Sequence, residues 1–269
     1  MTVIDLAPHN SYGLALRSPV IVAPGCIDAG NLRDIDPQLI GAITTRTAVL
    51  ETPRTQPPRW AAVPAGLVVE RLPVVTFRTL LTEAKRWLRS PVPVLLSLRG
   101  NADELAYMAV QLETVEGVAG LLVAFDETVT AAMVADVRAS TPLPLLITLP
   151  QRLLGASEVA AIVAAGADAL VVFGYPRASA MIDGELVDGV LLGPTLVPST
   201  LHGLRVAAEA VTVPRVAWGG IADATIAQHC LQAGAVAVLV DGAMYGDPQA
   251  PMRIGSALQR NTASAAAKA

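Results

Sequence analysis

The sequence has few of the residues that bind metals or form disulfides. It contains 2 cysteines and 3 histidines in 269 residues, and Cys26 and Cys230 lie far apart without a Cys-x-x-Cys motif. A disulfide framework or a structural zinc site needs several such ligands close together. We therefore expect neither, and we expect no bound metal.

Long hydrophobic runs and an excess of positive charge are also lacking. No apolar run reaches the roughly 18 residues that a membrane-spanning helix needs, and the N-terminus lacks the basic-then-apolar order of a signal peptide. The formal net charge of −4 disfavours nucleic acid or an anionic membrane surface as the main partner. These absences predict a cytoplasmic protein with neither kind of partner.

Aromatic residues are scarce, whereas aliphatic residues are abundant. Aromatics make up 4% of the chain and hydrophobic residues 53%, so we expect an aliphatic core. The charged share of 16% leaves apolar surface for an interface between copies of the chain. We therefore expect a homo-oligomer, such as a homodimer.

Short apolar runs alternate with helical stretches along the whole chain. The runs are continuous rather than alternating, which is typical of strands buried on both faces of a parallel sheet. They predict an α/β fold of the (β/α)8 (TIM) barrel class. The 8 runs span residues 19–23, 41–45, 92–97, 120–124, 144–148, 169–173, 214–218 and 236–240, and the helical windows span 77–89, 102–114, 129–140, 156–165, 199–211 and 222–233.

The chain shows no sign of a second domain. No Gly/Ser-rich or charged linker divides it, and its length suits one barrel. We expect residues 1–260 to form that barrel, with residues 1–18 covering its bottom. Residues 261–269 end in an alanine-rich tract, and we expect them to form a disordered tail.

Four arginines follow predicted strands, at the end of the barrel where ligands bind in this fold. Such a rim suits a small anionic ligand. The alternative is that these arginines are exposed and paired with nearby acids, each pair contributing about 0–1 kcal/mol. The four residues of the predicted ligand rim are Arg46, Arg99, Arg152 and Arg177.

Glycines end the last two predicted strands. Gly219 and Gly220 follow the seventh strand and Gly242 follows the eighth, where backbone N–H groups commonly bind a phosphate. Glycine allows the backbone to approach such an anion closely. This pattern favours a phosphate-bearing ligand, although a strand-to-helix turn also uses glycine without binding anything.

Several motifs resemble the dihydroorotate dehydrogenases, in particular the soluble class 1 enzymes. Residues 19–26, which read Pro-Val-Ile-Val-Ala-Pro-Gly-Cys, look like the first strand of that family and its turn over the flavin. The second strand and its proline-arginine loop resemble residues 39–46 and 53–59. The family order continues at similar spacing through residues 164–170, 193–194, 218–221, 233–235 and 247–248.

The resemblance implies a binding site for flavin mononucleotide (FMN) across the barrel mouth. In the family, the turns after strands seven and eight bind its phosphate, and dihydroorotate is oxidised against the flavin ring. Carried onto this sequence, the cofactor-binding positions are Ala23, Gly25, Arg46, Gly219, Gly220, Gly242 and Ala243.

The residues that run the family's chemistry differ here. Arg46 and Thr148 stand where the family has lysines. Positions that match its substrate asparagines hold Ser97, Ala124 and Gly174, and residues 67–71 lack the asparagine of the corresponding turn. The loop that carries the family's general base is also missing. Loss of paired polar groups can lower discrimination between substrates by about 10⁴ or more, so we expect no dihydroorotate oxidation.

The expected phosphate site carries an acid. Asp241 replaces a glycine of the family directly before Gly242. At roughly 4 Å and an effective dielectric constant of 20, each charge pair would cost about 4 kcal/mol. FMN binding is therefore expected to be weakened or lost, unless the carboxylate points into the barrel or onto Arg215.

No catalytic residue can be assigned from the sequence. Asp126, Glu127 and Cys26 lie near predicted strand ends and are candidates for a base or a nucleophile. The two acids equally suit a helix cap, and cysteine occurs at the Cys26 position in the family without acting as the base. Cys230 is expected to pack in the core.

Two functional hypotheses follow from the resemblance and its departures. The first is a pseudoenzyme, a dihydroorotate dehydrogenase-like barrel that has lost dihydroorotate oxidation and acts as a non-catalytic or accessory ligand-binding protein. The alternative is an FMN-dependent oxidoreductase that acts on CH–CH donors in a different small acidic substrate. An ordinary dihydroorotate dehydrogenase would need a partner to supply the lost groups.

Overall fold

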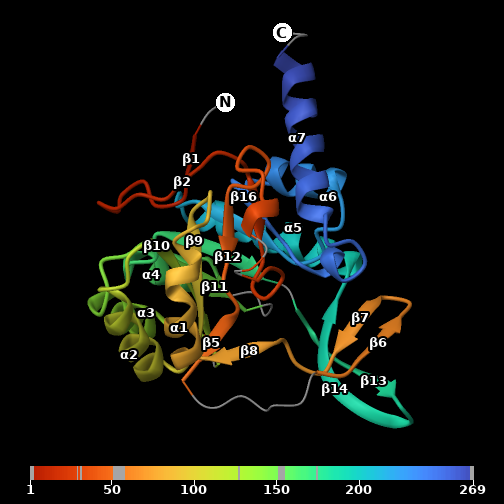
Figure 1. The fold of residues 1–269 in the computed structure, drawn as a ribbon, viewed down its shortest axis with the longest axis horizontal. Helices are drawn as coiled ribbons and strands as arrows, with labels where there is room; N and C mark the ends of the chain where they lie inside the picture. Colours follow the sequence, from red (N-terminus) through yellow and green to blue (C-terminus); the bar gives the residue numbers. More distant parts are fainter. Residues whose placement is uncertain are drawn as a thin grey trace.

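The computed structural model is a closed parallel barrel (Figure 1). It describes residues 3–28, 30, 32–50, 58–126, 128–150, 155–173 and 175–266. The barrel strands, in chain order, are β3 (Val20–Val22), β4 (Ala42–Thr44), β9 (Val94–Gly100), β10 (Val118–Phe125), β11 (Leu145–Leu149), β12 (Ala169–Phe173), β15 (Arg215–Trp218) and β16 (Ala237–Val240). Pairing of β9 with β10, in which Leu96 lies opposite Leu121, closes the barrel.

Helices cover the outside of this barrel. Several begin at side-chain caps that the sequence provides: Asn101 and Glu104 form a capping box, and Thr76, Thr130 and Asp223 each accept a backbone N–H. The (β/α)8 fold expected from the sequence is confirmed. The helices are α1 (Phe77–Trp87), α2 (Ala102–Leu112), α3 (Ala131–Ala139), α4 (Ala156–Ala164), α5 (Val197–Ala210), α6 (Ala224–Gln232) and α7 (Ala250–Ala266).

The core has two layers, which explains the continuous apolar runs. Neighbouring strand residues point to opposite faces, so Leu95 packs in the barrel interior and Leu96 packs under the helices. Both are almost fully buried, at 0% and 2% exposure. A strand with both faces covered has no solvent-facing position for a polar residue.

The N-terminal segment closes the bottom of the barrel. The strands β1 (Ile4–Asp5) and β2 (Ala15–Leu16) form an antiparallel pair, and Leu6 and Leu14 pack into the interior cluster. The Asn10 amide donates hydrogen bonds to Pro142 O at 3.1 Å and to Asp168 Oδ2 at 3.2 Å. This matches the role expected for residues 1–18.

A separate antiparallel sheet projects from the barrel on the side of the mouth (Figure 1). Its order is β13-β14-β7-β6, and the sequence reasoning did not predict it. The turn between β13 and β14 is Asp183-Gly184, with φ angles of 53° and 83°, which is a common hairpin signal. The strands are β6 (Trp60–Val63), β7 (Gly66–Val69), β13 (Arg177–Ile182) and β14 (Glu185–Leu192).

Two short strands and three short 3-10 helices complete the described fold. The strands β5 (Thr47–Val49) and β8 (Val74–Thr76) pair with each other, and β5 also pairs with β9. The 3-10 helices are η1 (Leu32–Asp34), η2 (Pro194–Leu196) and η3 (Gly242–Tyr245), and η3 directly follows the last barrel strand.

The C-terminal end differs from the expectation of a disordered tail from residue 261. Helix α7 continues past residue 260 as far as Ala266, because alanine has the highest helix propensity and the segment contains neither glycine nor proline after residue 255. Residues 267–269 lie outside the described residues. No helix in the described part of the chain is both long enough and apolar enough to cross a membrane.

Candidate ligand-binding site at the barrel mouth

A cavity of about 680 Å³, here called the mouth cavity, opens at the carboxyl ends of β9, β10 and β11. Ser97, Ala124 and Thr148 line it from these strands. Two arginines line it from the antiparallel sheet: Arg177, the first residue of the sheet's third strand in the chain, and Arg71, which lies just after its second strand. The antiparallel sheet therefore forms one wall of the mouth cavity, and the ends of the barrel strands form another.

The charged residues around the mouth cavity differ in how they are paired. Arg99 Nε lies 3.2 Å from Asp126 Oδ1, and Arg71 Nη1 lies 3.2 Å from Glu70 Oε2. No ion pair joins Arg177 to another described residue. Because both pairs are solvent-exposed at least in part, each contributes little and can be exchanged for a ligand carboxylate.

The structure brings together part of the predicted arginine rim. Arg99 and Arg177 line the mouth cavity, whereas Arg152 lies outside the described residues. Arg46 points elsewhere: its Nη2 lies 2.5 Å from Glu83 Oε1 on α1, and its Nε lies 3.9 Å from Asp28 Oδ1. Arg71 was missed, because its position depends on the antiparallel sheet that was not predicted.

The strand ends at the mouth carry hydroxyl groups instead of amines. Ser97 Oγ lies 2.9 Å from Thr47 Oγ1. The buried Thr148 hydroxyl has no hydrogen-bond partner among the described residues. The whole chain contains 2 lysines, of which Lys85 is exposed on α1 and Lys268 lies outside the described residues. The described part of the mouth therefore has no amine that could act as a base or hold a charge.

Two smaller cavities lie beside the mouth cavity, and Asp241 lines both. The first inner cavity, of about 390 Å³, includes Gly25, Cys26 and Trp218. The second inner cavity, of about 480 Å³, includes Gly220 and the η3 helix start. Residues that line both are Trp60, Leu192, Asp241 and Tyr245.

The Asp241 carboxyl is held by two donors inside the barrel. Trp218 donates its indole N–H to Oδ2 at 2.7 Å, and the Gly242 backbone N–H donates to Oδ1. Asp241 is 6% exposed, and burial raises the pKa of its carboxyl to about 7. The alternative contact with Arg215 is not made, because that side chain donates to Gly234 O and Val211 O.

The predicted cofactor glycine Gly220 lines the second inner cavity and directly follows Gly219. Gly219 and Gly220 have φ angles of 125° and 81°, which favour glycine. A Cβ on Gly220 would lie 3.0 Å from the Val197 nitrogen. Gly242 and Ala243 also line this cavity.

Two further predicted positions lie on the other side of Asp241. Gly25 lines the first inner cavity. Ala23 is fully buried in the barrel interior, where its backbone N–H donates to Val240 O at 3.1 Å. Ala23 therefore offers no free N–H to a ligand.

The described linings of the inner cavities offer the phosphate of FMN no cationic partner. These linings contain no lysine, arginine or histidine, and the Gly242 N–H already donates to Asp241. A phosphate dianion there would meet a carboxyl instead of a cation.

The remaining catalytic candidates are poorly placed for chemistry. Burial, with a smaller effect from Asp241, raises the pKa of the Cys26 thiol far above its ordinary value, so Cys26 is not an activated nucleophile. Asp126 is 57% exposed and paired with Arg99. Glu127 lies outside the described residues. Cys230 is fully buried in the core, as expected.

Groups that could bind a metal are not gathered in the described structure. No cluster of three or more histidine, cysteine, aspartate or glutamate side chains occurs among the described residues.

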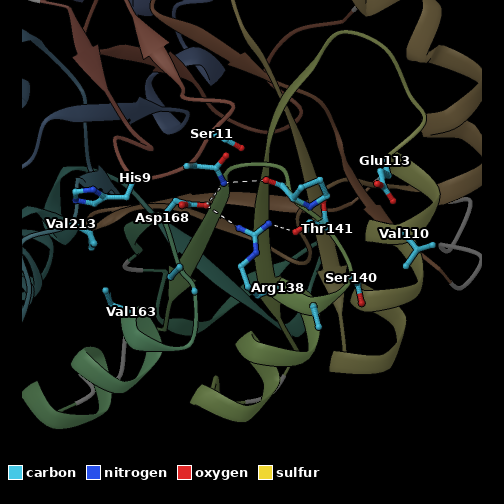
Figure 2. A pocket seen from close by; sticks show the side chains of 15 residues that line it. His9, Ser11, Val110, Glu113, Arg138, Ser140, Thr141, Val163, Asp168 and Val213 are labelled. Atoms are coloured by element: carbon cyan, nitrogen blue, oxygen red, sulfur yellow. Dashed lines mark hydrogen bonds and ion pairs between the residues drawn. The ribbon is translucent and has the colours of Figure 1, made fainter.

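A cavity of about 880 Å³ lies at the opposite, bottom end of the barrel (Figure 2). Arg138 Nη1 lies 3.0 Å from Asp168 Oδ2, and its Nη2 donates to Leu143 O at 2.9 Å and to Thr141 O. Asp168 also accepts the Leu145 N–H at 2.8 Å. These groups bond to one another and tie loops to the barrel, so this end contributes to stability.

The chain is similar to proteins from several bacteria. The catalytic subunit of dihydroorotate dehydrogenase B (NAD(+)) from Geotalea daltonii is 32% identical over 283 residues, covering 95% of this chain and 92% of the relative. The subunit of the same name from Desulforudis audaxviator is 32% identical over 286 residues, covering 92% and 90%. Dihydroorotate dehydrogenase A (fumarate) from Lacticaseibacillus paracasei is 28% identical over 276 residues, covering 91% and 94%.

A solved structure shares the fold. The crystal structure of DHODH in complex with ferulenol from Eimeria tenella matches 94% of this chain and 83% of its own, with a TM-score of 0.68 and 13% identity. At that identity the likeness concerns the fold alone. No protein family model matches the chain.

Proposed function

Because the chain belongs to the dihydroorotate dehydrogenase family, we propose that it is a ligand-binding barrel of that family that no longer oxidises dihydroorotate. Its ligand is a small carboxylate held at the barrel mouth. The observation that carries this proposal is the lining of the mouth cavity, where Arg71, Arg99 and Arg177 gather but no described amine is present.

The arginines suit a carboxylate because of their shape as well as their charge. A guanidinium group donates two parallel N–H bonds to one carboxylate, and such charge-assisted bonds are about twice as strong as neutral ones. Arg177 has no ion pair with another described residue that would have to break before it binds a ligand. Arg99 would exchange Asp126 for the ligand, at a small cost because both side chains are partly exposed.

The same lining supports a loss of oxidation. Removing a proton from carbon needs a positioned base, and the hydroxyl groups of Ser97 and Thr148 are weak bases near neutral pH. Asp241 lines both inner cavities directly before Gly242, a position that the family resemblance assigns to the cofactor, and this supports weakened FMN binding. Both observations favour binding over turnover.

Calorimetry with orotate and dihydroorotate as carboxylate probes tests the binding proposal. We expect Arg177→Glu to weaken binding by about tenfold or more, because an attraction becomes a repulsion. Arg205→Glu is the matched control, since Arg205 is exposed on α5 and pairs with Glu209 at 2.8 Å. Equal affinity of wild-type protein and Arg177→Glu for these probes would show that the mouth cavity is not the carboxylate-binding site.

An activity assay tests the loss of oxidation separately. We expect no dihydroorotate-dependent reduction of an acceptor dye, with or without added FMN. Turnover that depends on dihydroorotate and persists in Arg205→Glu would refute this part of the proposal.

A second candidate function is an FMN-dependent oxidoreductase acting on a different small acid. It is favoured by the left-handed turn at Gly219 and Gly220, of which Gly220 lines the second inner cavity, and by relatives that are named catalytic subunits. For this function Asp241 would have to turn away from Gly242. Purified protein that is yellow, with the absorbance bands of oxidised flavin, would support it, whereas a colourless protein favours the first proposal.

A further inference from the structure

The two inner cavities contain chemistry that the proposed function does not use. We propose that they bind a planar aromatic ring that carries no phosphate, and that Asp241 makes them reject the phosphorylated form of such a ring. This inference goes beyond the proposed function, because none of the mouth arginines lines either inner cavity.

Two exposed aromatic side chains flank the proposed site. Trp60 is 58% exposed and Tyr245 is 50% exposed, although each lines both inner cavities. Large aromatic side chains are costly to leave in water, and they stack well on planar ligands. Their place on the shared wall of the two cavities gives a ring an aromatic surface to cover.

The rest of the lining suits a neutral ring. Proline and aliphatic side chains dominate, including Leu72, Pro73 and Leu192. The volumes of about 390 and 480 Å³ lie in the range of small-molecule sites. No cationic side chain is present among the described lining residues, so a strongly anionic group finds no partner there.

Asp241 provides the polar group that distinguishes ligands. Its carboxyl is buried on the boundary between the cavities, and it already accepts the Gly242 N–H that a phosphate would require. A phosphate beside it would lose a donor and meet a like charge. A ring N–H would instead find an acceptor, since a carboxylate has lone pairs beyond the two used by Trp218 and Gly242.

Riboflavin and FMN are the matched probes, because they share one ring system and differ only in the phosphate. Binding is followed by quenching of flavin fluorescence in the wild-type protein at pH 8, where the Asp241 carboxyl, with its pKa of about 7, is ionised. We expect riboflavin to bind at least about tenfold more tightly than FMN, given the size of a like-charge repulsion in a buried site. FMN binding as tight as riboflavin binding, or no binding of either, overturns the proposal.

Aromatic variants locate the ring. Trp60→Ala should weaken riboflavin binding by about tenfold, in line with the usual effect of removing one stacking partner. Tyr107→Ala is the matched control, because Tyr107 is 54% exposed on α2 and lines neither inner cavity. An unchanged riboflavin affinity in Trp60→Ala would contradict the proposed position of the ring.

Charge variants separate this proposal from the previous one. Asp241→Asn should raise FMN affinity to within about threefold of riboflavin, because the charge is removed with little change in shape. If that variant does not fold, the comparison of the two flavins on wild-type protein still decides. Arg177→Glu should leave riboflavin binding unchanged. A lack of carboxylate binding at the mouth cavity would therefore not contradict ring binding in the inner cavities.

Discussion

Replacing Asp241 with asparagine should change how the stability of the fold depends on pH. Burial raises the pKa of the carboxyl from 3.8 to about 7 in the folded protein. The folded state therefore holds a proton that the unfolded state has released between about pH 4 and pH 7. Because this pKa is raised, the wild-type protein loses stability as pH rises through that window.

The size of this loss follows from the shift. Each pKa unit corresponds to about 1.36 kcal/mol, so the full shift is worth up to about 4 kcal/mol. Between pH 5 and pH 8 the wild-type protein should lose about 2–3 kcal/mol from Asp241 alone. Asp241→Asn stays neutral at every pH, but it keeps one acceptor oxygen for the two donors Trp218 and Gly242. We expect it to be about 1 kcal/mol less stable than wild type at pH 5.

Urea unfolding at pH 5, 6, 7 and 8 measures this effect for both proteins. The difference in free energy of unfolding between the two proteins removes the contribution of every other titrating group, so it reports on residue 241 alone. It should move by about 2–3 kcal/mol in favour of Asp241→Asn between pH 5 and pH 8. A difference that stays constant within about 0.5 kcal/mol would show that the carboxyl is not perturbed, and the reasoning about its burial would be wrong.

The remaining predictions concern the glycine turn and the bottom of the barrel. Gly220→Ala should lower the free energy of unfolding in urea by about 1–3 kcal/mol, because the residue has a φ of 81° and a Cβ would crowd Val197. Gly246→Ala is the control and should lower it by under about 1 kcal/mol, because the space around Gly246 is open. Equal effects would contradict the assigned turn geometry. Asp168→Ala should lower the free energy of unfolding by about 2–4 kcal/mol, since it leaves Arg138 without its ion pair and the Leu145 N–H without an acceptor. Asp136→Ala, on the exposed surface of α3, is the control and should lower it by under about 1 kcal/mol. Similar losses in both aspartate variants would refute the bottom network.

The barrel was predictable because its strands are buried on both faces. Runs such as residues 120–124 and 236–240 are continuously apolar, and each became a barrel strand. The antiparallel sheet was not predictable in the same way, since β6 and β13 carry mixed burial instead of a continuous apolar run. The Asp183-Gly184 hairpin signal was present in the sequence, but its pairing with a distant segment at β7 depends on the folded barrel.

The site was predictable at its strand ends and not in its loops. Arg99 is the second-to-last residue of the long barrel strand β9, so the fold alone directs it to the mouth. Arg46 follows a barrel strand, yet its guanidinium pairs with Glu83, which lies 37 positions further along the chain on α1. Strand register places a backbone, but it does not decide which of two partners a long, flexible side chain will reach.

Asp241 shows why orientation at a strand end decides function. The sequence offered three directions for its carboxylate: the phosphate site, the barrel interior and Arg215. Arg215 begins β15, at the end of the barrel opposite the mouth, and its donors are taken by backbone carbonyls there. Trp218, the last residue of the same strand, reaches Asp241 instead, and its indole is a donor that a purely aliphatic strand end would not provide. A tryptophan at that position and an aspartate one strand away therefore act as a pair, and replacing either alone should leave a buried polar group unsatisfied.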